Sequence, residues 1–147
     1  MTFIKIFIPL VLVWLISLPL DAADIDGDGF QDYQVSTDAN RTCVLDDNGV
    51  QCWGNNNYGQ TDVPTDLVNP VAVTTSSDHT CAIDDNGVQC WGRNDTGEIE
   101  VPTDLVNPVA VSANSQFTCA LDDNGVHCWG QNYFGQSNVP TDLVNPV

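Results

Sequence analysis

A twelve-residue segment occurs three times in this chain at a constant spacing, and this repeat limits the possible folds more than any other feature. The copies run from 43 to 54, from 81 to 92 and from 119 to 130. Each begins with cysteine and ends with Cys-Trp-Gly. A sustained period of this size is typical of an array of small supersecondary units that stack on one another. We therefore expect three similar structural units.

The pattern within each unit predicts β-structure. Short apolar or alternating runs are separated by Gly, Pro, Asn and Asp, and no stretch has a helical period, so the array is predicted to be all-β. In the middle unit we expect strands at 71–75, 80–84 and 88–91, and a weak outer strand near 98–101. Equivalent strands should lie one period earlier and one period later in the chain.

An Asp-Asp-Asn-Gly tetrad lies between the second and third predicted strands of each unit. The tetrads begin at Asp46, Asp84 and Asp122. They are typical of hairpin turns in which Asn and Gly take positive φ and Asp bonds its own backbone. Turn chemistry accounts for the paired carboxylates, and we assign them no catalytic role.

Six cysteines flank these turns in three identically spaced pairs. A two-residue loop would place the two cysteines of a pair directly opposite each other, whereas a bulged three-residue loop would shift them out of register. We expect one disulfide for each hairpin, which fits an oxidising compartment. Zinc is disfavoured because the two histidines do not recur as a ligand set. The predicted pairs are Cys43 with Cys52, Cys81 with Cys90, and Cys119 with Cys128.

A polar glycine loop follows each hairpin, at 53–60, 91–98 and 129–136, with the pattern Trp-Gly-x-Asn-x-x-Gly-Gln or Glu. This pattern resembles the regulator-of-chromosome-condensation repeat, in its secreted bacterial form with paired cysteines. The resemblance covers residues 33 to 147 and implies a β-propeller, which in the family has seven blades of four antiparallel strands. We therefore predict a partial propeller of about three blades over residues 34–147.

Three blades are too few to close a propeller, for which four to eight are usual. We expect the chain to be a truncated part of a longer propeller, since an exposed strand edge promotes aggregation. The alternative is that it assembles with other copies of itself.

The N-terminal segment 1–22 has the features of a signal peptide. Lys5 precedes an apolar run from 6 to 20, and Ala22 and Ala23 follow it. The run is shorter than the ~20 apolar residues of a membrane span, which disfavours an uncleaved anchor. We expect cleavage after Ala22, no membrane insertion afterwards, and a secreted, periplasmic or cell-surface protein.

An acidic leader at 23–33 follows the predicted cleavage site. Four aspartates and the carbonyl of Phe30 match ligand positions of a calcium loop, and Gly29 matches its sharp turn. The stretch resembles thrombospondin type 3 and dockerin loops, but Val35 replaces the glutamate that would complete the ligand set. We predict a weak Ca²⁺ site, and the alternative is a flexible leader. The predicted ligands are Asp24, Asp26, Asp28, Phe30 and Asp32.

The net charge of -17 excludes some classes of partner. Nucleic acids and anionic lipid surfaces are bound mainly through Lys and Arg, and this chain has only 3 such residues. A basic patch on a protein, or a divalent cation, remains a suitable partner.

Function is predicted where the three copies differ from one another. Differences gather in the glycine loops, and in a second group formed by Arg41, His79 and Phe117. Exposed aromatic residues in such loops would suit protein binding, although they could instead fill gaps between blades. We expect a protein-binding module with no enzymatic activity, or alternatively a calcium-stabilised structural segment of a larger envelope protein. The predicted partner-binding residues are Tyr58, Thr96, Tyr133 and Phe134.

Overall fold

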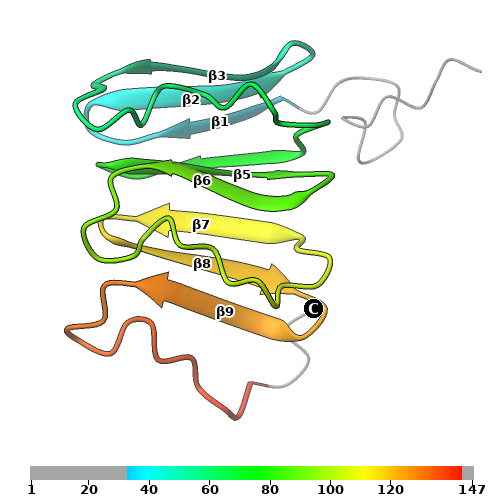
Figure 1. Ribbon diagram of the computed structural model, residues 1–147, viewed down its shortest axis with the longest axis vertical. Coiled ribbons are helices and arrows are strands. Elements are labelled where there is room, and N and C mark those ends of the chain that lie inside the picture. Colours follow the sequence, from blue (N-terminus) through cyan, green and yellow to red (C-terminus); the bar gives the residue numbers. More distant parts are fainter. Residues whose placement is uncertain (1–32, 144–147) are drawn as a thin grey trace, which may run out of the picture.

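The computed structural model describes residues 33–143 and contains three antiparallel sheets of three strands each, which we call blades 1, 2 and 3 (Figure 1). The predicted signal peptide, the calcium-ligand residues from Asp24 to Asp32 and the last four residues lie outside the described part. The strands are β1 (Gln34–Thr37), β2 (Arg41–Asp46), β3 (Gly49–Gly54), β4 (Ala72–Thr75), β5 (His79–Asp84), β6 (Gly87–Gly92), β7 (Ala110–Asn114), β8 (Phe117–Asp122) and β9 (Gly125–Gly130).

The hairpin turns form as predicted, with one difference in backbone conformation. Asp46 pairs with Gly49, so the loop has two residues, and the Asp46 carboxylate accepts a hydrogen bond from the Asn48 N–H at 2.8 Å. Gly49 has a φ of 92°, and the equivalent glycines are also positive. Asn48 does not have positive φ. That part of the prediction was wrong, because glycine alone supplies the left-handed residue of the turn.

All three predicted disulfides are present. Cys43 lies directly opposite Cys52 on β2 and β3, with a Cα–Cα distance of 4.1 Å. The other two bridges have the same register and the same Cα–Cα distance. Each bridge therefore joins the second and third strands of its blade, and the two-residue loop is what brings the cysteines into register.

The predicted outer strand near 98–101 does not form, so each blade has three strands and not four. The backbone closes on itself in this segment: the Glu100 N–H donates to the Gly97 carbonyl, and the Val101 N–H donates to the Ile99 carbonyl. These amides are used in local turns, and the following Pro102 has no N–H to donate. The segments after the first two glycine loops reach the hairpin of the next blade, where the Val68 N–H bonds Asp84 and the Val106 N–H bonds Asp122, and they pair with no sheet as a strand.

The three sheets stack face to face in one column (Figure 1). At the first interface, Val73 of blade 2 packs against Cys43 and Leu45 of blade 1, and all three are almost fully buried. Side chains of β1 also bond the backbone of β4, where Thr75 N–H donates to the Ser36 hydroxyl at 3.0 Å. The core is therefore divided between the interfaces of successive blades, and no closed ring is formed by the described residues.

A polar clamp repeats at each interface. The Gln60 carbonyl at the end of blade 1's glycine loop accepts hydrogen bonds from the Thr80 hydroxyl at 2.8 Å and the Trp91 indole N–H at 3.0 Å. In the next interface, the Glu98 carbonyl accepts the same two bonds, at 2.9 and 3.0 Å. The donors there are Thr118 and Trp129. The recurring Thr and Trp thus fix each glycine loop to the blade that follows it.

Candidate protein-binding rim

The glycine loops of all three blades lie along one edge of the stack, on the left in Figure 1. Each loop begins beside the turn between the first two strands of its own blade. The Asn55 N–H donates to the Asn40 carbonyl at 3.0 Å, and the equivalent amides at Arg93 and Gln131 make the same bond at 2.9 and 2.8 Å. We call the loops at 54–60, 92–98 and 130–136 the rim.

The residue at the end of each loop holds the loop in shape. The side-chain oxygen of Gln60 accepts the Tyr58 N–H at 2.7 Å, and that of Gln136 accepts the Phe134 N–H at 2.9 Å. The Glu98 carboxylate does the same for Thr96 at 2.7 Å. Gln60 and Glu98 are fully buried. The repeated residues therefore fix the backbone, and in blades 1 and 3 the variable side chain two positions earlier is exposed.

Three of the four predicted partner-binding residues are exposed on this rim. The exposed fraction is 48% for Tyr58, 81% for Tyr133 and 93% for Phe134. Thr96 is half-buried, and its hydroxyl lies 2.7 Å from the Glu98 carboxylate and 3.1 Å from the Gln116 carbonyl. Thr96 thus connects neighbouring blades, whereas the aromatic residues present free surface.

The exposure of Tyr133 does not arise because no described blade follows blade 3. Its equivalents, Asn57 and Asp95, are not buried either, even though another blade follows each of them. Tyr58 differs, because its ring centroid lies 5.0 Å from the Arg93 guanidinium carbon of the next blade. A cation over an aromatic face is attractive, so Tyr58 both faces solvent and contacts its neighbour.

Arg93 lies within an acidic part of the rim. Its guanidinium is 2.8 Å from the Asp78 carboxylate and 2.5 Å from that of Asp95. Hydrogen bonds to Asp78 and Asp95 raise the pKa of Arg93 above its usual value. Two carboxylates therefore surround a single guanidinium, which leaves this part of the rim with negative charge.

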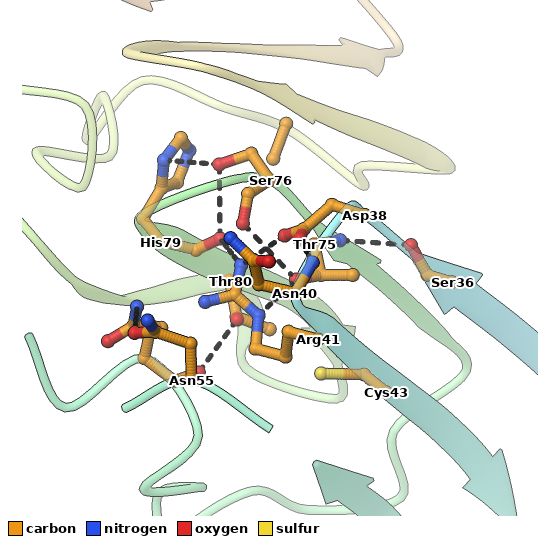
Figure 2. Close-up of polar contacts among 12 residues, drawn as sticks. Ser36, Asp38, Asn40, Arg41, Cys43, Asn55, Thr75, Ser76, His79 and Thr80 are labelled. Carbon is orange, nitrogen blue, oxygen red and sulfur yellow. Dashed lines mark hydrogen bonds and ion pairs between the residues drawn. The ribbon is translucent and has the colours of Figure 1, made fainter. Parts of the chain in front are cut away.

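The second variable group is not a surface. Arg41 is almost fully buried between blades 1 and 2, and His79 is fully buried with its ring against blade 3. Phe117 is half-buried. Figure 2 shows Arg41 extending from β2 toward blade 2, where Nε donates to the Thr75 hydroxyl at 2.6 Å and a terminal nitrogen donates to the His79 carbonyl at 3.2 Å. The same nitrogen pairs with Asp38 at 3.0 Å. Arg41 therefore links two blades, and variation at this position adjusts packing between them.

His79 is fully buried, and its hydrogen bonds define its tautomer. The Thr118 hydroxyl donates to the Glu98 carbonyl, so it accepts from His79 Nε2 at 2.8 Å. Nδ1 is then unprotonated and accepts from the Ser76 hydroxyl at 2.9 Å. Burial is the main cause that lowers the pKa of His79 to about 4. The Ser76–His79 pair is enclosed by the protein, so the serine is not presented to a substrate.

The hairpin aspartates have a role that sequence analysis missed. Besides capping its own turn, Asp84 accepts the Val68 N–H of the preceding segment at 2.9 Å, and Asp122 accepts the Val106 N–H at 2.7 Å. Burial would raise the pKa of Asp122, but these N–H donors and the nearby His127 outweigh it and lower the pKa. The signal was the identical Asp in each tetrad, where turn chemistry alone would accept Asn or Ser.

Within residues 33–143, no group of three or more His, Cys, Asp or Glu side chains has the arrangement of a metal site. In the same residues, no helix is long and apolar enough to cross a membrane.

Comparison with known proteins identifies the repeat. The family profile described as the regulator of chromosome condensation (RCC1) repeat matches residues 34–60, 71–98 and 109–136, which is more than half of the chain. None of the curated protein sequences compared with this chain matches it.

Several solved structures have a similar fold. They include the ectodomain of the receptor kinase CR4 from Physcomitrella patens, with 24% identity and a TM-score of 0.57, covering 67% of this chain and 29% of that one. Prp20p from Saccharomyces cerevisiae has 17% identity and a TM-score of 0.61 over 78% and 35% of the two chains. Human WBSCR16 has 25% identity and a TM-score of 0.60 over 77% and 38%. This chain thus spans about a third of the length of these structures.

Proposed function

Because this chain belongs to the family of regulator of chromosome condensation (RCC1) repeats, we propose that it is a protein-binding module whose contact surface is the rim. The family relationship supports a binding role, since the solved structure of Prp20p was described together with its binding to Gsp1p and histones. Another structure of that yeast protein contains Kap60.

The exposure of Tyr133 is the observation that carries this proposal. An aromatic side chain that is 81% exposed leaves apolar surface in contact with water, at a position where the other two blades have Asn and Asp. Aromatic residues are enriched among the residues that dominate interface energies. The rigid turn behind Tyr133 lowers the entropy that binding would cost, because the loop backbone is already fixed by Gln136 and Asn132.

The charge of the chain points to the chemistry of the partner. Asp78 and Asp95 flank the rim in blade 2, and the net charge of the whole chain is -17. Opposite charge accelerates encounter and disfavours acidic competitors. We infer a partner with a basic surface and an apolar recess that accepts the rim tyrosines.

The proposal includes a place of action outside the cytoplasm. Three disulfides in a domain of this size support it, because such bonds persist mainly in oxidising compartments. The signal-like sequence at 1–22 supports the same location.

The test compares a rim substitution with a matched substitution on the opposite edge. Partners are captured from extracellular or periplasmic extract, and affinities are then measured with purified wild-type, Tyr133→Ala, Tyr58→Ala and Val106→Ala proteins. Val106 is an exposed apolar residue bonded to the hairpin end of blade 3, away from the rim. We expect Tyr133→Ala to weaken binding by roughly 30-fold, as for an interface hot spot of about 2 kcal/mol, and Val106→Ala to have no effect. Equal affinities for all four proteins would exclude the rim as the contact surface.

A further inference from the structure

The outer face of blade 1 exposes apolar and polar groups that are buried at the equivalent places in blade 2. Val35 is 63% exposed, whereas its equivalent Val73 is 2% exposed. Trp53 is 55% exposed, whereas Trp91 is 8% exposed. The difference arises because blade 1 covers Val73 and Trp91, while no described residue covers Val35 and Trp53.

The opposite end of the array exposes the complementary groups. The free face of blade 3 has an open apolar hollow of about 290 Å³, lined in part by Cys119, Leu121 and Val126. Their equivalents in blade 1 are Cys43, Leu45 and Val50, which form the cluster that receives Val73. The hollow on blade 3 therefore corresponds to the site on blade 1 that Val73 fills, and no described residue fills it.

The groups that form the polar clamp also lie at the two ends of the array, with the acceptor on blade 3 and the donors on blade 1. Within the chain, a glycine-loop carbonyl accepts hydrogen bonds from the Thr and Trp of the next blade, as Gln60 does from Thr80 and Trp91. Among the described residues, the Gln136 carbonyl of blade 3 has no such donor. Thr42 and Trp53 of blade 1 are the same two donor types, and residues 33–143 offer them no such acceptor. One end therefore carries the groups that the other end lacks.

We propose that these two faces dock on each other between two copies of this chain, head to tail. Val35 of one copy enters the hollow of the other, and Trp53 and Thr42 donate to the Gln136 carbonyl. The contact continues an interface that already occurs twice inside each chain, with the same residue types. The described residues of two copies form six blades, which is within the four to eight of closed propellers, and two identical contacts would join them.

The affinity between the two copies should depend on salt concentration, because their net charges repel. The groups that meet are uncharged, so the contact itself is insensitive to ionic strength. Each copy carries a net charge of -17, and the two copies repel each other over long distances. Salt screens that repulsion, with a Debye length of about 10 Å at 0.1 M. Association should therefore become stronger as salt is added.

The first experiment measures mass by sedimentation velocity over a range of concentrations at low and moderate salt. The wild-type protein should have about twice the mass of the monomer at high concentration. Val35→Glu and Trp53→Ala should remain monomeric, with at least a tenfold larger dissociation constant. Both substitutions are at exposed positions, so circular dichroism should show an intact fold. Tyr133→Ala is the matched control on the rim and should associate as the wild type does.

The second experiment distinguishes a head-to-tail contact from a symmetric one. Val35→Glu disables one face, and Leu121→Glu disables the other. Each variant alone should be monomeric, but a mixture should form a mixed dimer through the one contact that remains intact. A symmetric dimer would not recover on mixing, and that result would overturn the proposal.

Two further results would also overturn it. One is a wild-type protein that stays monomeric at high concentration with Trp53 open to quenching. The other is a monomer in which Trp53 is protected, which would show that another segment of the chain covers this face. Either result leaves the rim proposal intact, because Tyr133 lies outside the docking faces.

Discussion

Replacing Trp91 by phenylalanine tests whether the clamp between blades stabilises the array. Trp91 is 8% exposed, and its indole N–H donates to the Gln60 carbonyl at 3.0 Å. Phenylalanine removes this donor and leaves a smaller ring in the interface. Trp53→Phe is the matched control, because Trp53 occupies the same place in blade 1 but is 55% exposed and has no such acceptor within the described part of the chain.

The expected cost follows from these contacts. Loss of a neutral hydrogen bond costs about 1 kcal/mol. The Gln60 carbonyl keeps its bond from the Thr80 hydroxyl at 2.8 Å, so this acceptor is not left without a partner. The smaller ring adds about 1–2 kcal/mol of lost packing. Trp91→Phe should therefore cost about 2–3 kcal/mol, whereas an exposed substitution such as Trp53→Phe should stay within about 0.5 kcal/mol.

Urea unfolding followed by far-ultraviolet circular dichroism measures both variants, at a protein concentration low enough to keep the chain monomeric. Trp129→Phe provides a repeat of the experiment, because Trp129 makes the equivalent bond to the Glu98 carbonyl at 3.0 Å. Equal costs for Trp53→Phe and Trp91→Phe would refute the reasoning, since stability would then not depend on the contact between blades.

Three other predictions concern charge, backbone conformation and metal. His79 has its pKa lowered to about 4 by burial, so the unfolded chain binds more protons than the folded one between about pH 4 and 6.5. Its contribution, about 3 kcal/mol at 1.36 kcal/mol per pKa unit, is fully present above pH 6.5 and is lost as the pH falls toward 4. His79→Gln should remove this part of the pH dependence of the urea midpoint, and an unchanged slope would count against it. Gly92 and Gly87 both have positive φ, but a Cβ at Gly92 would lie 2.6 Å from the Asp78 carbonyl oxygen, whereas a Cβ at Gly87 has nothing within 4 Å. Gly87→Ala should cost about 1–2 kcal/mol from backbone conformation alone, and Gly92→Ala should cost several kcal/mol more in the same unfolding assay; similar costs would show that the close approach is unimportant. Calcium should bind weakly to the acidic leader and produce heat in titration calorimetry that Asp26→Asn with Asp28→Asn abolishes. Identical heats from the wild-type protein and the double variant would exclude a calcium site in the leader.

The elements inside one blade were predictable because their signals are local. The constant period located the first three strands of each blade closely, since the cysteines, the turn glycine and the Trp-Gly step each have a fixed place in a hairpin. The disulfide register followed from the two-residue loop. The fourth strand was mispredicted because Glu100 and Val101 use their amides in local turns, which a pattern of apolar residues does not reveal.

Contacts between blades could not be predicted in the same way. Arg41 and His79 vary among the copies, as rim residues do, yet they are buried because their partners come from the neighbouring blade. Arg41 bonds Thr75 of blade 2, and His79 bonds Thr118 of blade 3, so both partners are distant in the sequence. A comparison of aligned repeats shows that a position varies, but only the stacking of the sheets shows whether it faces solvent.

The glycine loop of blade 2 explains how the rim can change its chemistry without changing its shape. In blade 1 the Gln60 amide donates to Asn55 at 3.2 Å, and in blade 3 the Gln136 amide donates to Gln131 at the same distance. Glu98 has no amide to donate, so the residue five positions earlier need not be an acceptor.

That residue is Arg93, which turns instead to Asp78, Asp95 and the ring of Tyr58. Burial would raise the pKa of Glu98, but bonds from its own N–H and from the Thr96 hydroxyl and N–H outweigh it and lower the pKa, so the carboxylate stays charged. One Glu98 oxygen is buried and has no partner among the described residues, while the other still accepts the Thr96 N–H as glutamine does in the other blades. The acceptor that fixes the backbone is therefore kept in every copy. The other half of the same side chain can differ between copies, and this difference allows a basic residue in the loop of blade 2.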